Sequence, residues 1–223
     1  FIADGADHFG LYKANIMVMN DTPYEVNDVS VCFTKAFNDV PIDAFAQTQI
    51  HSMAGARIPS GCGLGNFCPD DITTRGVMAR WLTKSMFGPD YSPPPCVGIF
   101  ADVVCETTAN SSYIEALFNE GVTAGCNADP LMYCPDAPVL RSQMAVFLLK
   151  ALLGPQFVPP ACVGIFTDVS CPDGFAVDWI EAFFNAGITA GCGVDLYCPS
   201  NDTSRAEMGV FEQITFDFPM CEE

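Results

Sequence analysis

The sequence predicts a mainly α fold in which a helix-loop-helix unit of about 65 residues occurs three times after an N-terminal β-hairpin or arm. Three observations predict it. The same landmark residues recur three times in one order, half of the 223 residues are apolar while only 16% are charged, and the first residues alternate between apolar and polar. Such a composition can bury a core and excludes intrinsic disorder. We expect an arm over 1–35 and repeats over 36–99, 100–165 and 166–223.

The N-terminal segment is expected to form a β-hairpin outside the repeats. Apolar residues alternate with polar or thioether residues in two stretches, which are Tyr12, Ala14, Ile16 and Val18, and then Val29, Val31 and Phe33. The sequence Asn20–Pro23 between them is typical of a turn. Two strands are marginally stable alone, so the hairpin is expected to pack on the helical body or on another subunit.

Each repeat opens with a Phe-x-Asp-Val motif, continues through an apolar helical stretch to a Gly-Cys pair, and then reaches a Cys-Pro pair. An arginine after this second cysteine begins another apolar stretch. The opening residues are Phe37, Phe100 and Phe166, and the arginines are Arg75, Arg141 and Arg205. Because these landmarks keep their order, each repeat is expected to form the same structure.

Two amphipathic helices are expected in each repeat. Tyr113, Ile114, Leu117 and Phe118 share one helical face, and Gly121 follows where a glycine would end the helix. The second helix is expected to begin at the arginine; Ser204–Glu207 has the form of a capping box, and Gly-Pro pairs at 88–89 and 154–155 would end it. Since two short helices cannot bury their apolar faces alone, the three repeats are expected to pack together.

The twelve cysteines predict a disulfide framework, because their number is even and no Cys-x-x-Cys spacing is present for a metal or haem site. The spacing predicts the pairs Cys62–Cys68, Cys126–Cys134, Cys192–Cys198, Cys96–Cys105 and Cys162–Cys171. Cys32 and Cys221 then remain, either joined within one chain, which we favour, or each bonded to a neighbouring molecule. Disulfides persist in oxidising compartments, so the protein is expected to be secreted or at the cell surface, with its leader removed.

The charge of the chain excludes several partners. Nine Lys and Arg stand against 27 Asp and Glu, which gives a formal net charge of −18. So acidic a protein repels nucleic acid and anionic headgroups. The most apolar stretch, Met144–Leu153, contains a lysine and is far shorter than the ~20 residues that cross a bilayer. We therefore expect neither nucleic-acid binding nor a membrane span.

The repeated motifs resemble those of the S-layer homology family. They are Phe-x-Asp-Val, a helix, Gly-Ile/Val-Thr-x-Gly, an aromatic-rich loop before proline, and Thr/Ser-Arg-x-x-Met before a second helix, in three copies over residues 36–220. The resemblance implies a pseudo-threefold bundle in a bacterial surface protein that binds cell-wall polysaccharide. It also implies that Arg75, Arg141 and Arg205 contact the glycan in grooves between repeats.

A second interpretation of these arginines stays open. A guanidinium group is a planar fork that suits the carboxylate of an acidic sugar. A structural interpretation, which we favour, is an internal ion pair of each arginine with Asp39, Asp102 or Asp168, since a cation near a helix N-terminus needs a compensating negative charge.

No catalytic residues and no specific metal site are predicted. The two histidines, His8 and His51, stand in no recognised nucleophile motif, and the cysteines are assigned to disulfides. The loops contain Asp70, Asp71, Asp129, Asp195 and Asp202, but no calcium-binding loop motif is present. We expect no cofactor, with diffuse Ca²⁺ binding to the acidic surface at most.

These observations favour a non-enzymatic extracellular structural protein that self-assembles into a filament or surface layer. The repeats make up nearly the whole chain, which suits a building block, and an alternating strand with open edges can add to a neighbouring copy. The alternative is a module that anchors a protein to cell-wall polysaccharide, and an interaction module for another partner remains a third possibility. The expected partners are further copies of the chain and a wall polysaccharide.

Overall fold

The computed structural model of the chain describes residues 12–13, 30–31, 37–41 and 43–218. Within this part the protein is mainly helical, as the sequence predicts. Its elements are the helices α1 (Gln47–Gly55), α2 (Arg75–Phe87), α3 (Ser111–Asn119), α4 (Arg141–Leu153), α5 (Val177–Asn185) and α6 (Arg205–Phe216), and the strand pairs β1 (Tyr12–Lys13) with β2 (Ser30–Val31) and β3 (Asn127–Ala128) with β4 (Leu131–Met132).

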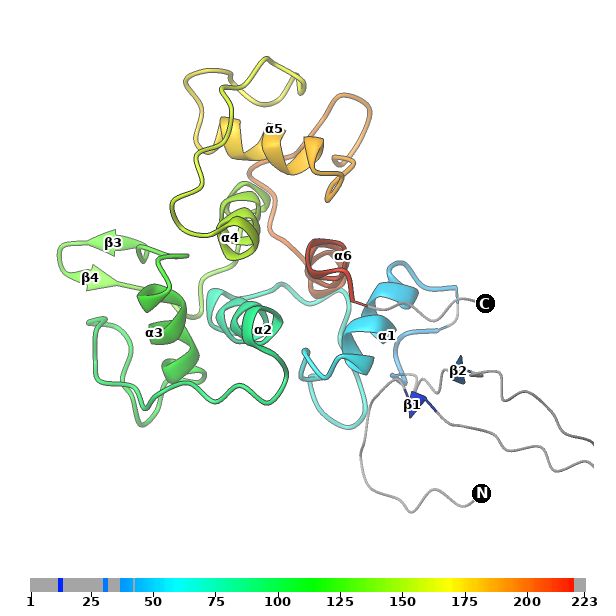
Figure 1. The fold of residues 1–223 in the computed structure, drawn as a ribbon, viewed down its shortest axis with the longest axis vertical. Helices are drawn as coiled ribbons and strands as arrows, with labels where there is room; N and C mark the ends of the chain where they lie inside the picture. Colours follow the sequence, from blue (N-terminus) through cyan, green and yellow to red (C-terminus); the bar gives the residue numbers. More distant parts are fainter. Residues whose placement is uncertain (1–11, 14–29, 32–36, 42, 219–223) are drawn as a thin grey trace, which may run out of the picture.

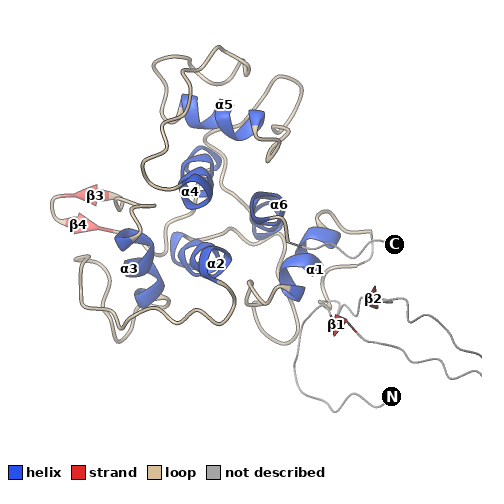
Figure 2. Ribbon diagram, in the orientation of Figure 1, coloured by secondary structure: helices blue, strands red, loops and turns tan. Residues whose placement is uncertain are grey.

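The helices form an inner group and an outer group joined by long loops (Figure 2). The inner helices α2, α4 and α6 all contact one another, and each outer helix packs against one inner helix. The pairs are α2 with α3, α4 with α5, and α6 with α1 (Figure 1). We call the first two pairs, with their loops, the internal junctions, and the third pair the closing junction because it joins helices from the two ends of the repeat region.

The closest helix pairs join neighbouring repeats and not the two helices of one repeat. The backbones of α1 and α2, of α3 and α4, and of α5 and α6 do not approach each other closely, although the rings of Phe183 on α5 and Phe211 on α6 touch, with centroids 5.4 Å apart. The outer helix of each repeat instead packs on the inner helix of the preceding repeat. A single repeat therefore cannot bury its own apolar faces, and the body requires all three.

The inner helices begin at the predicted arginines because the residue before each arginine is extended. The hydroxyl of Ser204 accepts a hydrogen bond from the N–H of Glu207, whose carboxylate accepts from the N–H of Ser204, and Thr74 caps α2 in the same position. Leu140 precedes α4 without a side-chain oxygen to cap it. Gly88 ends α2 at φ 97°, where a side chain would be strained.

The segments before the inner helices form a closed triangle of backbone hydrogen bonds. Thr73 N–H donates to Thr203 O at 2.9 Å, Thr203 N–H donates to Val139 O at 2.9 Å, and Val139 N–H donates to Thr73 O at 3.0 Å. Bridges of β type join the same three segments pairwise. Every repeat is thus bonded to both others, and Thr73 and Thr203 are completely buried at this centre.

One apolar core runs through the three repeats. Its largest fully buried side chains come from all of them and include Phe67, Trp81, Tyr133, Phe183 and Tyr197. Aromatic rings contact one another along the core. The ring centroids of Phe100 and Tyr133 are 5.4 Å apart, and those of the equivalent pairs in the other two repeats are 5.2 and 5.5 Å apart. The body is one packing unit and not three separate lobes.

Ten of the cysteines form five disulfides, with the pairs that the spacing predicts: Cys62–Cys68, Cys126–Cys134, Cys192–Cys198, Cys96–Cys105 and Cys162–Cys171. The Cys126–Cys134 loop is two residues longer than its counterparts, and it contains the β3–β4 hairpin. Cys32 and Cys221 lie outside the described residues.

The strands β1 and β2 pair antiparallel, with Tyr12 opposite Val31 and Lys13 opposite Ser30. They agree with a hairpin at the N-terminus, although the predicted turn and most of the predicted arm lie outside the described residues. The backbone of neither described strand comes close to a described helix. Among the described helices, none combines the length and apolarity that crossing a bilayer requires.

Candidate functional site

The three arginines that begin the inner helices are buried. Arg75, Arg141 and Arg205 retain only 4%, 3% and 7% of their exposure. Each side chain enters the next repeat, where its Nε donates to the carbonyl of the residue before the Cys-Pro pair. The three bonds run from Arg75 to Tyr133 at 2.8 Å, from Arg141 to Tyr197 at 3.0 Å, and from Arg205 to Phe67 at 2.8 Å.

Two aromatic rings enclose each guanidinium group. The Cζ of Arg141 lies 5.2 Å from the ring centroid of Tyr197 and 5.3 Å from that of Phe211. Arg75 and Arg205 have the same surroundings, with Phe147 and Trp81 as the rings from the next inner helix. Such contacts stabilise a buried cation. Burial lowers the pKa of Arg75 while Tyr133 and Asp102 oppose the shift.

The aspartates of the Phe-x-Asp-Val motifs do not form the expected ion pairs with these arginines. Both oxygens of Asp168 instead accept backbone N–H groups, from Tyr197 at 2.9 Å and Cys198 at 2.7 Å. Asp39 and Asp102 do the same in their own loops. The aspartate thus binds backbone N–H groups of the loop, and the arginine binds a carbonyl group of the same loop. The two residues share this loop without forming an ion pair with each other.

Backbone groups complete each of these contacts between an arginine and the next repeat, which we call a latch. The N–H of Arg75 donates to Ala137 O at 2.9 Å, and the N–H of Gly76 donates to Pro135 O at 2.8 Å. The first N–H groups of a helix have no partner within the helix, and here the next repeat supplies one. The same bonds occur at α4 and α6. The arginines therefore connect repeats, which is the structural interpretation with a different partner from the one expected.

A pocket of about 320 Å³ nevertheless reaches Arg141. It is lined by the Gly187–Gly191 loop after α5, by Glu207 and Phe211 on α6, and by Phe45 before α1. Arg141 Nη1 donates to Glu207 Oε1 at 2.8 Å, whereas the buried Nη2 has no partner. At the closing junction the corresponding Nη2 of Arg205 donates to Ser60 O instead.

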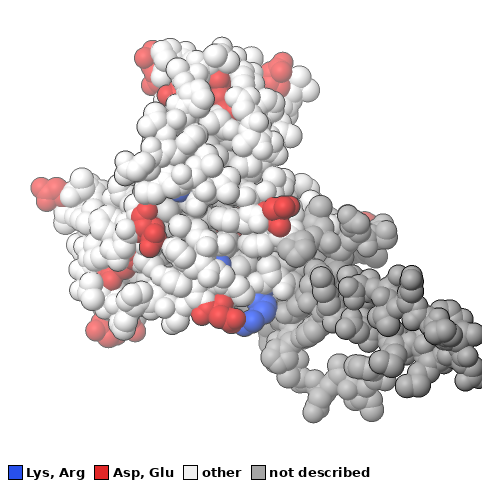
Figure 3. Space-filling model, viewed as in Figure 1, with Lys and Arg blue, Asp and Glu red and all other residues white. Residues whose placement is uncertain are grey.

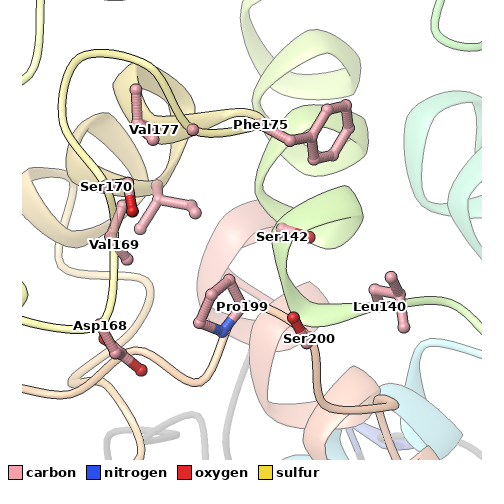
Figure 4. Close-up of a pocket in the computed structure, with 11 residues that line it drawn as sticks. Leu140, Ser142, Asp168, Val169, Ser170, Phe175, Val177, Pro199 and Ser200 are labelled. Atoms are coloured by element: carbon pink, nitrogen blue, oxygen red, sulfur yellow. The ribbon is translucent and has the colours of Figure 1, made fainter.

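A second pocket, of about 370 Å³, lies between the start of α4 and the loop before α5. Figure 4 shows Val169, Ser170 and Val177 on the side of α5, Leu140 and Ser142 on the side of α4, and Pro199 and Ser200 between them. Phe175 also lines this pocket and is 68% exposed. Its lining combines aliphatic side chains with serine hydroxyls and the exposed carboxylate of Asp168.

Two buried glutamates form sites that sequence reasoning missed. Glu181 on α5 accepts the N–H groups of Val163, Gly164 and Ile165 at 2.6–2.8 Å. Burial alone would raise the pKa of Glu181, but these three bonds outweigh it and lower the pKa. Glu115 on α3 binds the equivalent loop. The signal for both is present in the sequence, since Cys-Val-Gly-Ile-Phe precedes each helix at the same distance.

The groups that could hold a metal ion all contain disulfide sulfurs. In the part of the chain that the structure describes, five clusters bring an Asp or Glu oxygen near two cysteine sulfurs. Each sulfur pair is a disulfide, and the thiolate is the form that binds metals. His51 lies buried on α1 with Nδ1 2.8 Å from Gln47 Nε2, and burial lowers its pKa. His8 lies outside the described residues.

The face drawn in Figure 3 carries scattered Asp and Glu side chains around the edges of the body and few basic atoms. In comparisons with known proteins, the chain matches no family model and no curated protein.

Proposed function

We propose that the protein is a non-enzymatic extracellular structural protein that assembles into a filament or surface layer. In this proposal residues 36–220 form three repeats of the S-layer homology type, and the N-terminal β-arm joins one copy to the next. The repeated motifs and the latches between repeats support the first part. The five disulfides support a secreted or cell-surface location, because they persist outside reducing compartments.

The observation that carries the proposal is the β1–β2 pair at the N-terminus, whose backbone lies beyond close approach of the described helices. The helical body closes on itself through three junctions and the central triangle of hydrogen bonds. The backbones of the two described strands lie close to each other and not to any described helix. A two-stranded ribbon is marginal in water without further packing, and in this proposal a second copy supplies that packing.

A shortened protein tests this proposal. It begins at Lys35 and carries Cys221→Ser, so that no unpaired thiol remains. We expect its helical circular dichroism and melting temperature to stay close to those of the full chain carrying Cys32→Ser and Cys221→Ser, which is the matched control. Electron microscopy is expected to show regular polymers for the control and none for the shortened protein. Polymers of normal shape without the arm would refute the proposal.

The alternative function, anchoring to cell-wall polysaccharide, is favoured by one observation. The Arg141 pocket is lined by this guanidinium group, by the carboxylate of Glu207 and by the exposed ring of Phe45. Aromatic rings and charged forks are common means of binding acidic sugars. This alternative predicts that the intact protein binds isolated cell-wall polymer and that Phe45→Ala weakens binding without lowering the melting temperature.

Arginine substitution alone does not decide between the two functions. Arg141→Ala removes a latch as well as a possible glycan contact, so a loss of binding would be ambiguous. Phe45 is 69% exposed and takes no part in a latch. Unchanged polymer binding by the Phe45→Ala protein would exclude this pocket as the anchor site.

A further inference from the structure

We propose that a basic patch beside α2 binds carboxylates of a second copy and so forms one half of a head-to-tail contact between copies. The patch consists of Arg57 in the loop after α1 and of Arg80 and Lys84 on α2. It faces the start of α3, where the ring centroid of Tyr113 lies 5.9 Å from the Cζ of Arg80. This inference rests on the proposed function, since it names a surface through which copies assemble.

The first observation is the distribution of positive charge over the chain. Nine basic residues stand against 27 acidic ones. Three of the nine are the arginines of the latches, and two, Lys13 and Lys35, belong to the N-terminal segment. Of the four that remain, three form the basic patch and the fourth is Lys150 on α4. In the described part of the body, positive charge outside the latches is therefore concentrated at one place.

The second observation is a comparison with the third repeat. The residues equivalent to the basic patch are all uncharged there and line the Arg141 pocket; they are Gly187, Val210 and Ile214. Glu207, which pairs with Arg141 in that pocket, has Val77 as its equivalent on α2. The first repeat thus carries three positive charges where the third repeat carries none, and it lacks the carboxylate that the third repeat has.

The third observation is the backbone conformation of Arg57. Its φ is 60°, in the left-handed region, and the equivalent residues Gly121 and Gly187 have φ values of 71° and 72°. Glycine adopts this conformation without strain, whereas a residue with a side chain does not. The first repeat therefore carries an arginine where the other two repeats carry the less strained residue. Strain of this kind is concentrated at functional sites, which indicates a role for the Arg57 side chain.

The fourth observation is that the patch is not neutralised by its own surroundings. Arg57 pairs with Asp90 at the surface. In the part of the chain that the structure describes, no carboxylate pairs with Arg80 or Lys84, and the buried Nε of Arg80 has no hydrogen-bond partner. These two residues are one turn apart on α2, where like charges repel. Burial and the charges of Arg80 and Arg57 lower the pKa of Lys84, and Asp90 opposes this shift.

Charge complementarity selects a second copy as the partner. Two molecules with a net charge of −18 repel each other at most surfaces, so a contact between copies needs a place where the opposed charges differ in sign. The basic patch is such a place, and each copy supplies exposed carboxylates, among them those of Asp70, Asp129, Asp195 and Asp202.

The sign of the patch also determines the symmetry of the contact. Two basic patches repel each other, so a two-fold contact of patch with patch is unfavourable. The patch of one copy must instead meet a different, acidic surface of the next copy. Such head-to-tail contacts produce open polymers unless the rotation between copies closes a ring. This is the type of contact that a filament or a surface layer requires.

The test replaces each residue of the patch by its equivalent in the third repeat, which the same fold already accommodates. The variants are Arg57→Gly, Arg80→Val, Lys84→Ile and the combination of all three, in the full-length, unreduced protein. The matched control is Lys150→Ile, which makes the same change at the place of Lys84 on α4. Sedimentation and electron microscopy measure assembly, and melting temperatures show that each variant is folded.

The expected effects concern the concentration needed for polymer formation. Arg80→Val and Lys84→Ile should each raise it about threefold, and the triple variant should raise it at least about tenfold, which is about 1.4 kcal/mol per contact. Lys150→Ile should leave it unchanged, as should Lys84→Arg, which keeps the positive charge. The difference between the triple variant and the unaltered protein should shrink as NaCl is raised to about 0.5 M, because salt screens exposed charges.

The outcomes separate this inference from the proposed function. If the protein that begins at Lys35 fails to polymerise while the triple variant polymerises normally, this inference is wrong and the proposed function stands. A lower melting temperature of the triple variant with normal assembly would show that the patch acts within one chain, which also refutes the inference. Loss of binding to isolated cell-wall polymer with normal assembly would assign the patch to a polysaccharide and refute it as well.

The proposed function can fail in two ways. If the shortened protein polymerises normally, the role of the arm is wrong, and a triple variant that still fails to assemble would support the patch contact on its own. If the unaltered protein forms no polymers, the proposed function and this inference are both wrong.

Discussion

The internal junctions and the closing junction use the same latch but differ in what surrounds it. At the internal junctions the hydroxyl groups of Tyr133 and Tyr197 donate to the carbonyls of Arg75 and Arg141 at 2.8 and 2.7 Å. At the closing junction the equivalent residue is Phe67, which has no hydroxyl group. The arginine is therefore common to all three junctions, whereas the tyrosine hydroxyl contact is present only at the two internal junctions.

The outer helices show the same division. Glu115 on α3 and Glu181 on α5 each bind three backbone N–H groups, whereas His51 stands at this place on α1. The closing junction instead uses the segment after α6. The carbonyl of Phe218 accepts a hydrogen bond from Ser52 Oγ at 3.2 Å and another from Gln213 Nε2 at 3.0 Å.

Chain connectivity explains this difference. At each internal junction one loop links the paired helices, so the partners are close in sequence. The closing junction pairs α6 with α1, which are separated by most of the chain, and its formation therefore restricts the unfolded chain more. Contacts from the C-terminal segment supply part of what covalent continuity supplies elsewhere.

The largest expected effect comes from removing a latch. Arg141→Ala leaves the carbonyl of Tyr197 without its donor and Glu207 without its cation, and we expect unfolding to become about 3 kcal/mol easier. Arg205→Ala should lower the free energy of unfolding by a similar amount if the latch contributes equally at all three junctions. Urea unfolding of the oxidised protein measures both. The control is Arg57→Ala, because the Arg57–Asp90 ion pair is exposed and should contribute less than about 1 kcal/mol.

Removing the carboxylate of α5 is expected to have the next largest effect. Glu181→Ala leaves three backbone N–H groups without their acceptor and should destabilise the protein by about 2 kcal/mol at pH 7. Because the pKa of Glu181 is lowered in the folded state, its contribution is present above the ordinary pKa of 4.5 and is lost as the pH falls through the folded value. Urea unfolding at several pH values measures this.

A matched control for Glu181 is Glu120, which is exposed at the end of α3. Glu120→Ala should change the free energy of unfolding very little at any pH. Equal losses for the two variants would mean that the three N–H groups near Glu181 find other partners, and the distinction between the junctions would then be weaker than the structure indicates.

Glu212 offers a test on the inner helix of the closing junction. It is completely buried on α6 at the place that Leu82 and Leu148 occupy on α2 and α4. Ser85 Oγ donates to its Oε2 at 3.2 Å, and Oε1 has no partner. Burial raises the pKa of Glu212 well above 4.5. The folded state therefore favours the neutral acid, and the stability present below pH 4.5 is lost as the pH rises through the folded pKa.

Glu212→Leu is accordingly expected to stabilise the protein by about 1 kcal/mol at pH 7, since it removes a buried carboxyl group that has an oxygen without a hydrogen-bond partner. The gain should shrink toward pH 4, where the carboxyl group is neutral in both states. Thermal unfolding from pH 4 to pH 8 measures this trend. A gain that does not depend on pH would show that packing, and not ionisation, separates Glu212 from the two leucines.

The smallest expected effect concerns the tyrosine hydroxyl. Tyr197→Phe gives an internal junction the ring found at the closing junction and leaves the carbonyl of Arg141 without this donor, so we expect a loss of about 1 kcal/mol. Tyr133→Phe should do the same. Chemical unfolding detects such a difference, and unchanged stability in both variants would show that the hydroxyl groups do not distinguish the junctions.

Sequence reasoning predicted the features that depend on nearby residues. Helices beginning at Arg75 and Arg205 follow from their capping residues, and the disulfides follow from separations of six to nine residues, as for Cys192 and Cys198. It failed where the partner is distant. Nothing in the local pattern shows that α1 packs on α6, or that Arg205 binds the carbonyl of Phe67, because both contacts depend on how the repeats close.

The charged residues show the same limit. An aspartate and an arginine that recur together predict an ion pair, but backbone groups of one loop satisfy both Asp168 and Arg141. A buried backbone N–H or carbonyl needs a partner as much as a charge does. The sequence does not show which backbone groups lack a partner until the loop conformation is known.

The triangle formed by Thr73, Val139 and Thr203 also limits the number of repeats in the body. Open solenoid proteins lengthen by inserting further repeats, since each repeat contacts only its neighbours. Here every donor in the triangle already has its acceptor, so a fourth repeat would have no vacant group to join. A further repeat could enter only by opening this triangle, so growth of such a body has to take place outside it.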